Sequence, residues 1–176
     1  MIDFSQDYFT LFGLPPRYRC DKARLDAAYR ALQTEVHPDR FTAAGAAEQR
    51  LALQSSARVN EAYRALKDPV GRAQYLLSLH GIDATSETDT ALPLDFLERQ
   101  LERREAVDEA RVARDVARLE ALLAQVRTEI AALEPLLAET LDQRQSWASA
   151  RASVRELQFL SKLAADIDSA IAGIED

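Results

Sequence analysis

The feature that most constrains this chain is a His-Pro-Asp tripeptide, residues 37–39, between two segments with helical apolar periodicity. The apolar residues on one face are Leu25, Tyr29, Leu32 and Val36 before the tripeptide, and Ala52, Val59, Ala62 and Leu66 after it. Because Pro38 disfavours the α region for the residue before it, the first helix should end near Val36 or His37. The sequence therefore predicts a helical hairpin whose rigid, exposed corner is suited to docking on another protein.

The composition is typical of an all-α protein that forms one domain or two small ones. Of the 176 residues, 47% are hydrophobic and only 5 are glycine, which allows a packed core and argues against disorder. Alanine, leucine, glutamate and arginine dominate, and runs of β-branched residues are almost absent. The single cysteine, Cys20, excludes internal disulfides and fits a reducing compartment. Since the N-terminus lacks a leader pattern and no apolar run could span a membrane, we expect a cytoplasmic protein with no membrane partner.

The net charge of −7 is distributed unevenly along the chain. Up to Leu76 there are 11 Lys and Arg residues against 9 Asp and Glu, whereas from Leu77 onward there are 11 against 20. An acidic C-terminal half argues against a nucleic-acid partner, because binding a phosphate backbone requires a basic face. The difference between the halves also indicates two regions with different surfaces, and so with different partners.

The pattern of periodic segments divides the chain into three parts. Residues 1–81 contain the hairpin, and Asp21 is placed to cap its first helix. Residues 82–93 are polar, rich in threonine and aspartate and without periodicity, so we expect them to form a linker. Residues 94–176 resume the helical pattern with three segments that can pack as an antiparallel three-helix bundle.

The middle helix of this C-terminal region has a sustained apolar seam. It consists of Val116, Leu119, Leu123, Val126, Ile130, Leu133, Leu137 and Leu141, at steps of three and four residues. Pro135 lies inside the seam and should kink or locally break the helix, because proline removes a backbone donor and crowds the preceding turn.

Several motifs in this order resemble the J-domain family. A short aromatic helix, a helix that ends in His-Pro-Asp, and a long helix with Asn-Glu-Ala-Tyr at 60–63 before Asp68-Pro69 are similar to the domain by which DnaJ-type co-chaperones activate DnaK-type ATPase chaperones. Segments 7–15 and 72–81, with the three-helix acidic C-terminal region, resemble more closely the HscB family, the J-proteins of iron–sulfur cluster assembly. The resemblance spans nearly the whole chain and implies a J-domain followed by a C-terminal scaffold-binding domain.

The resemblance implies that the tripeptide stimulates ATP hydrolysis by the specialised DnaK-type chaperone HscA. The candidate chaperone-binding residues are His37, Pro38, Asp39, Arg24, Arg30 and Arg40. An ionised Asp39 can accept a bidentate arginine from the partner. Many J-domains have a strongly basic face on the helix before the tripeptide, but here Asp26 interrupts a thin patch of arginines. Electrostatic steering should therefore be modest, which favours a dedicated partner over broad chaperone use.

The resemblance also implies that the C-terminal region binds the cluster scaffold protein IscU. The residues that match the family's scaffold-binding surface are Leu97, Leu101, Glu102, Glu105, Glu109 and Phe159. On a helical projection, Leu97 and Leu101 lie opposite the face that contains Phe96 and Gln100, and Phe159 points away from the apolar face of the last helix. Either these side chains are core, or they are exposed anchors with an acidic rim.

Catalysis is poorly supported by the sequence. His37 and His80 belong to separate motifs, Cys20 has no partner in a motif, and the chain has neither a glycine-rich phosphate loop nor metal-ligand spacing. We therefore expect no enzyme activity, no cofactor and no bound metal. The leading hypothesis is a co-chaperone that binds the scaffold and delivers it to HscA. The alternatives are a J-protein for a different client, or a structural helical protein whose seam at 116–141 mediates oligomerisation.

Overall fold

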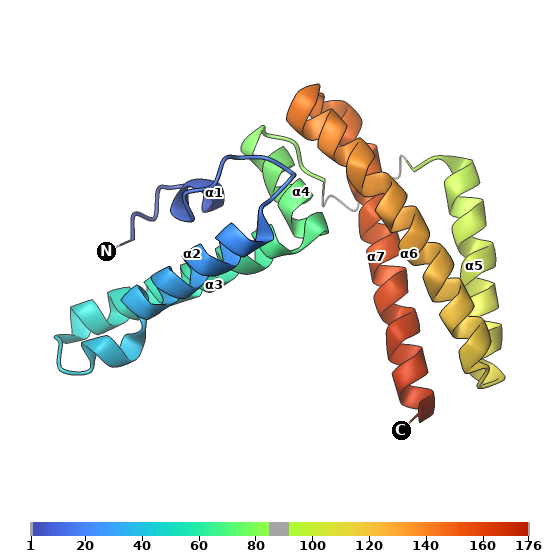
Figure 1. The fold of residues 1–176 in the computed structure, drawn as a ribbon, viewed down its shortest axis with the longest axis horizontal. Coiled ribbons are helices and arrows are strands. Elements are labelled where there is room, and N and C mark those ends of the chain that lie inside the picture. The colour runs from blue at the N-terminus through green and yellow to red at the C-terminus, as the bar shows by residue number, and fades with distance from the viewer. Residues whose placement is uncertain (1, 85–91, 176) are drawn as a thin grey trace. The chain divides into compact units, whose positions relative to one another are not determined.

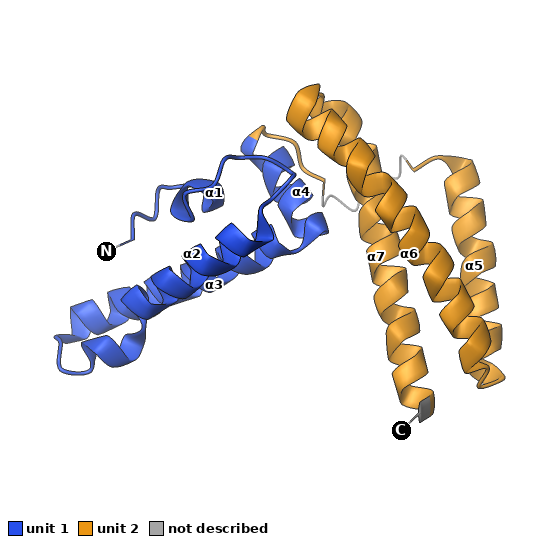
Figure 2. Cartoon of the chain, viewed as in Figure 1, with its two compact units in different colours: residues 1–79 blue, residues 80–176 orange. Residues whose placement is uncertain are grey.

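The computed structural model describes residues 2–84 and 92–175, and all regular elements in those ranges are helices (Figure 1). The all-α fold class predicted from composition is confirmed. The chain forms two compact units, residues 1–79 and 80–176 (Figure 2). Most of the linker expected at 82–93 lies outside the described residues.

The first unit is built on the helical hairpin. Its elements are α1 (Tyr8–Leu11), α2 (Lys22–Val36), the 3-10 turn η1 (Pro38–Phe41), α3 (Ala46–Lys67) and α4 (Pro69–Leu79). The Asp21 carboxylate accepts a hydrogen bond from the Arg24 N–H at 3.0 Å and caps α2, as the sequence predicts. The helix ends at Val36 because His37, which precedes the proline, has extended backbone angles.

The core of the first unit lies where α1, α2 and α4 meet α3. It includes the buried residues Tyr8, Phe9, Phe12, Leu25, Val59, Ala62, Leu66, Ala73, Leu76 and Leu77. Tyr75 of α4 stacks on Tyr8 with ring centroids 4.1 Å apart, and its hydroxyl accepts a hydrogen bond from the Tyr8 N–H at 2.9 Å. These contacts hold α1 and α4 together, while η1 lies at the other end of the hairpin (Figure 1).

The second unit is a three-helix bundle. Its elements are α5 (Leu94–Val112), α6 (Val116–Ala138), the π-helical turn η2 (Glu139–Gln143) and α7 (Trp147–Glu175). The long helices α6 and α7 form the main pair, and α5 packs beside them (Figure 1). The core includes Phe96 and Val107 of α5, Leu119, Leu123 and Val126 of α6, and Leu160, Leu163 and Ile167 of α7. The apolar seam predicted for α6 therefore packs against the other helices of the same bundle.

Pro135 does not break α6 at its own position. The helix continues through the proline to Ala138, and the regular pattern changes only in the wider turn of η2. Leu137 and Leu141 on either side of this change are buried, so packing holds the segment in place. Tertiary contacts therefore override the local tendency of proline to end the helix.

Candidate protein-binding surfaces

The His-Pro-Asp corner forms an exposed turn directly after α2. The backbone N–H of Asp39 donates to His37 Nδ1 over 3.3 Å, and the same ring nitrogen lies 3.6 Å from Asp39 Oδ2. The Asp39 side chain is 85% exposed. An ionised carboxylate in this position keeps acceptor capacity for a donor from another protein. The structure therefore presents the two polar groups as the sequence predicts, and their role in chaperone binding stays a prediction.

The three candidate arginines around the turn differ in what they contact. Arg24 and Arg30 are exposed on α2. The Arg40 guanidinium instead donates to the Thr34 carbonyl at 3.2 Å. This contact satisfies one of the last carbonyls of α2, so Arg40 also stabilises the C-terminal end of that helix.

Asp26, which stands between the candidate arginines in the sequence, also contacts α3. Its half-buried carboxylate accepts a hydrogen bond at 2.8 Å from the Tyr63 hydroxyl of α3, and Tyr63 stacks on Tyr29 with ring centroids 3.8 Å apart. A projection of α2 alone cannot reveal this, because the contact depends on the helix that packs against it. The aspartate therefore takes part in the contact between α2 and α3.

The outer face of α5 presents exposed apolar side chains beside carboxylates. Leu97 and Leu101 are 40% and 62% exposed, in agreement with the helical projection. The glutamates predicted beside them, which are also exposed, are Glu102, Glu105 and Glu109. Glu109 accepts a hydrogen bond from Arg118 of α6 at 2.9 Å, whereas the other two have no ion-pair partner among the described residues. An apolar centre with a charged rim is the arrangement found in protein interfaces.

Phe159 is half-buried and so lies between the two alternatives, core and exposed anchor, that the sequence left open. Its ring lies edge-on to the buried Phe96 of α5, with centroids 5.8 Å apart and an interplanar angle of 80°. The Arg104 guanidinium carbon lies 5.6 Å from the Phe159 ring centroid. Helical projection of α7 placed this ring outside the apolar face, but α5 lies alongside and covers part of it. The ring therefore belongs to the contact between α5 and α7, where it meets Phe96 and Arg104 of α5.

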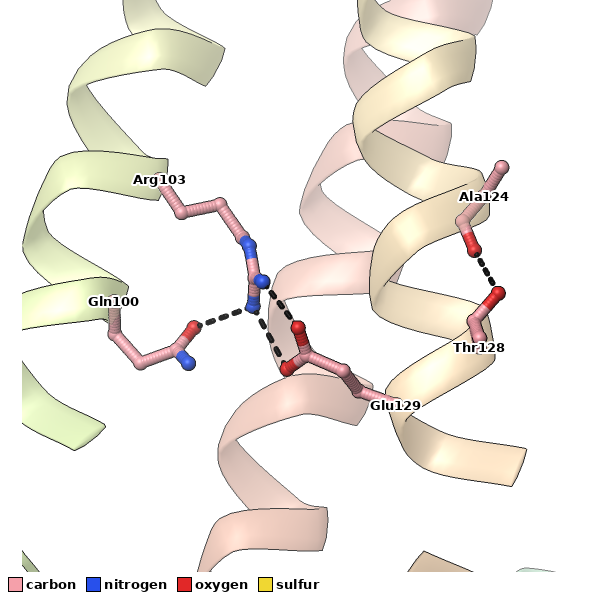
Figure 3. A network of polar contacts seen from close by, with 5 residues as sticks. All are labelled: Gln100, Arg103, Ala124, Thr128 and Glu129. Atoms are coloured by element: carbon pink, nitrogen blue, oxygen red, sulfur yellow. Dashed lines mark hydrogen bonds and ion pairs between the residues drawn. The ribbon is translucent and has the colours of Figure 1, made fainter. Parts of the chain in front are cut away.

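A polar network fixes the rotation of α5 against α6 (Figure 3). Arg103 donates to Gln100 Oε1 at 3.1 Å and to Glu129 Oε2 at 3.2 Å, and its second terminal nitrogen pairs with Glu129 Oε1. Gln100 is 2% exposed, and its amide nitrogen has no partner among the described residues. With these polar groups held inward, the side of the helix that contains Leu97 and Leu101 faces outward. The sequence missed this pairing because its partners belong to different helices.

Two family models together match most of the chain. The DnaJ domain matches residues 7–75, and the HSCB C-terminal oligomerisation domain matches residues 92–168. Among curated proteins, the co-chaperone protein HscB homologs of Burkholderia multivorans and Azoarcus sp. are 47% and 46% identical to this chain, over 99% of both chains in each case. The chain belongs to the HscB family of co-chaperones.

Solved structures of HscB proteins share the fold described above. Chaperone HscB from Vibrio cholerae has a TM-score of 0.84 and 35% identity, and the match covers 96% of this chain and 99% of that one. The human co-chaperone protein HscB has a TM-score of 0.88 and 28% identity, with 95% and 83% covered. The resemblance to HscB drawn from the motifs is therefore confirmed, as is the order of J-domain and helical C-terminal domain.

A pocket next to the turn is a feature of this HscB-family protein that the sequence did not reveal. It has a volume of about 320 Å³ and is lined by Glu35, Val36, Arg40, Phe41, Glu48, Leu51, Ala52 and Ser55. These residues come from α2, η1 and α3, and they converge only when the hairpin is folded. Because these residues do not lie on one face of one helix, the apolar periodicity of the sequence does not identify them.

The described part of this HscB-family chain offers no metal site or membrane span. In residues 2–84 and 92–175, no group of three or more His, Cys, Asp or Glu residues could hold a metal ion, and no helix is long and apolar enough to cross a membrane. Burial raises the pKa of the half-buried Cys20 thiol, although the nearby Arg72 acts in the opposite direction. Such a thiol is a weak nucleophile at neutral pH.

Proposed function

We propose that this protein binds an iron–sulfur cluster scaffold of the IscU type and brings it, in the cytoplasm, to an HscA-type DnaK chaperone whose ATP hydrolysis it stimulates. The observation that carries the proposal is that its two candidate surfaces belong to separate compact units. Residues 1–79 expose the His-Pro-Asp turn, and residues 80–176 expose Leu97 and Leu101 beside carboxylates. A protein built in this way can hold two partners at once. Membership of the HscB co-chaperone family supports the same function.

On the chaperone side, the chemistry rests on Asp39. Its exposed carboxylate can accept both prongs of a guanidinium, which gives geometric specificity as well as attraction. His37 Nδ1 accepts the Asp39 N–H and so helps to hold the turn in shape. Arg24 and Arg30 add a positive charge that favours an acidic surface on the chaperone. The protein supplies contacts, and the chaperone performs the hydrolysis.

On the scaffold side, the apolar centre supplies affinity and the rim supplies orientation. Leu97 and Leu101 lose water-exposed surface when a partner covers them, which is favourable in proportion to the apolar area. Glu102 and Glu105, without ion-pair partners among the described residues, are available to lysine or arginine of the scaffold. The proposed partner surface therefore has an apolar patch with basic residues around it.

A reconstituted ATPase assay with the purified chaperone and scaffold tests the proposal. Asp39→Asn keeps the shape of the side chain and removes its charge, so stimulation should fall to the basal rate while scaffold affinity and helicity stay unchanged. The matched control is Asp166→Asn, which makes the same change at an exposed position of α7 and should stimulate normally. Normal stimulation by Asp39→Asn would rule out the assigned role of the turn.

The alternative of a structural oligomer finds less support. Its proposed seam on α6 is buried within the bundle of the same chain, through Leu119, Leu123 and Val126. Self-association through those residues would require α7 to separate from α6. Size measurement by light scattering alongside the ATPase assay distinguishes the two functions. A J-protein for a different client would stimulate the chaperone without binding the scaffold.

A further inference from the structure

The four arginines of α5 differ in what neutralises their charge. Three are ion-paired: Arg99 with Asp95 at 3.7 Å, Arg111 with Asp108 at 3.6 Å, and Arg103 with Glu129 of α6. Arg104 is exposed and has no carboxylate partner among the described residues, although the helix is acidic. Arg104 therefore differs from the other three arginines of α5, each of which is paired with a carboxylate.

The guanidinium of Arg104 lies over the ring of Phe159. Its central carbon is 5.6 Å from the ring centroid, within the range of a cation–π contact, while Phe96 supports the ring from within the bundle. At an exposed site this contact is weak, so it positions the guanidinium without neutralising it. All five N–H donors of the guanidinium remain available to an acceptor outside the protein.

Helix geometry places Arg104 and the glutamates on opposite flanks of the apolar centre. At about 100° per residue, Arg104 lies about 60° to one side of Leu101, and Glu105 and Glu102 lie about 40° and about 100° to the other side. The face is therefore polarised: a cation above Phe159, then exposed leucines, then carboxylates. A partner with a uniformly basic surface would meet repulsion on the Arg104 flank.

The geometry points to Arg104 as a specificity-determining residue that binds a carboxylate of the scaffold protein. This inference rests on the proposed scaffold binding and adds the chemistry of the partner: one acidic side chain opposite Arg104, and basic side chains opposite Glu102 and Glu105. Arginine suits this role because its planar fork donates two parallel hydrogen bonds to a carboxylate. With opposite charges on the two flanks, only one rotation of the scaffold brings unlike charges together.

Titration calorimetry of the full-length protein with the purified IscU-type scaffold of the same organism tests this inference. Arg104→Gln removes the charge at similar size and should weaken binding about tenfold, and Arg104→Glu should weaken it about a hundredfold because it adds repulsion. Arg104→Lys keeps the charge but loses the fork, and should retain part of the affinity. The matched control is Arg99→Gln, on the opposite side of α5, which should bind within about twofold of wild type.

Thermal melts of the same variants separate recognition from folding. The melting temperature should be nearly unchanged, because Arg104 is exposed and makes no ion pair with a described residue. If Leu101→Ala weakens binding but Arg104→Gln and Arg104→Glu bind as wild type does, the role of Arg104 is overturned and the proposed function stands. Tighter binding by Arg104→Gln also overturns the role of Arg104, because the arginine would then be blocking access to the exposed leucines in the wild type. If wild type itself does not bind the scaffold, both proposals fail.

Discussion

The two candidate surfaces of this molecule are built in opposite ways. In the first unit the turn residues are neighbours in sequence, and Pro38 fixes their geometry through the local backbone. In the second unit the candidates are spread over α5 and α7, and contacts between helices decide which of them face outward. The geometry of the turn follows from residues that are neighbours in sequence. Which residues of a helix face are exposed depends on the helices packed against it.

The difference has a consequence for mutagenesis. Changes within the turn should affect partner binding with little effect on stability, because its side chains are exposed and make few contacts. On the α5 face the exposed leucines should behave in the same way, but the residues behind them should affect stability and binding together.

The largest effect is expected where a leucine of the second unit is core. Leu157→Ala removes a fully buried side chain of α7 and should lower the free energy of unfolding by about 2–5 kcal/mol. Leu101→Ala should change that free energy by no more than about half a kcal/mol. The same variant should weaken scaffold binding by more than about 1 kcal/mol. Denaturant unfolding and titration calorimetry measure the two quantities.

This pair of variants also separates the two interpretations of the apolar residues on α5. If Leu101→Ala loses several kcal/mol of stability and keeps its affinity for the scaffold, the outward face of α5 is core. The binding surface would then have to lie elsewhere on the second unit.

A smaller effect is expected from the contact that sets the rotation of α5. Glu129→Gln removes the carboxylate that pairs with Arg103, whose side chain is 12% exposed, and should cost about 1–2 kcal/mol of unfolding free energy. Scaffold affinity should fall as well, although Glu129 is not on the candidate face. Without the pairing, the rotation of α5 is less fixed, and so are the positions of Leu97 and Leu101. The control is Glu120→Gln, an exposed glutamate of α6, which should change neither quantity. Unchanged affinity in a destabilised Glu129→Gln would show that the face does not depend on this pairing.

The features that the sequence predicted are those set by local rules, and the features that it missed are those set by contacts between helices. The end of α2 at Val36 and the inner face of α5 follow from local rules, since proline restricts the residue before it and apolar periodicity marks a buried face. The burial of Phe159 against Phe96, and the turn of Asp26 toward Tyr63, depend on which helix lies alongside. A projection of one helix contains no information about its neighbour. The exposure of the turn and of Leu97 and Leu101 could therefore be predicted from local rules, whereas the partial burial of Phe159 could not.

In the first unit, removing a contact between helices should leave the turn working. Tyr63→Phe keeps the ring that stacks on Tyr29 and loses the hydroxyl that donates to Asp26, so unfolding should become easier by about 1 kcal/mol. Stimulation of the chaperone should remain normal, because the geometry of residues 37–39 is local. A double variant with Asp26→Asn should lose little more than either single variant. Loss of stimulation in a folded Tyr63→Phe would contradict the contrast between the two units.

The smallest effect concerns a second local device of the first unit, the cap of α1. Asp7 accepts hydrogen bonds from the N–H groups of Phe9 and Thr10 at 2.8 Å and 3.0 Å, and from the Thr10 hydroxyl at 2.5 Å. Burial alone would raise the pKa of Asp7, but these hydrogen bonds together outweigh it and lower the pKa below the ordinary value of 3.8. A carboxyl whose pKa is lowered by folding stabilises the folded state above its unfolded pKa. That contribution is lost as the pH falls through the folded pKa.

Asp7→Asn isolates this charge, because asparagine keeps an oxygen that can cap the helix. Wild type should melt at a higher temperature than Asp7→Asn at pH 7, and the difference should shrink below about pH 4 as the wild-type carboxyl takes up a proton. Thermal melts of both proteins across this range measure the difference. A difference that stays constant down to about pH 2 would mean that shape, and not charge, is what the cap contributes. The cap of α1 would then act through the hydrogen-bonding oxygen of residue 7, which asparagine also provides.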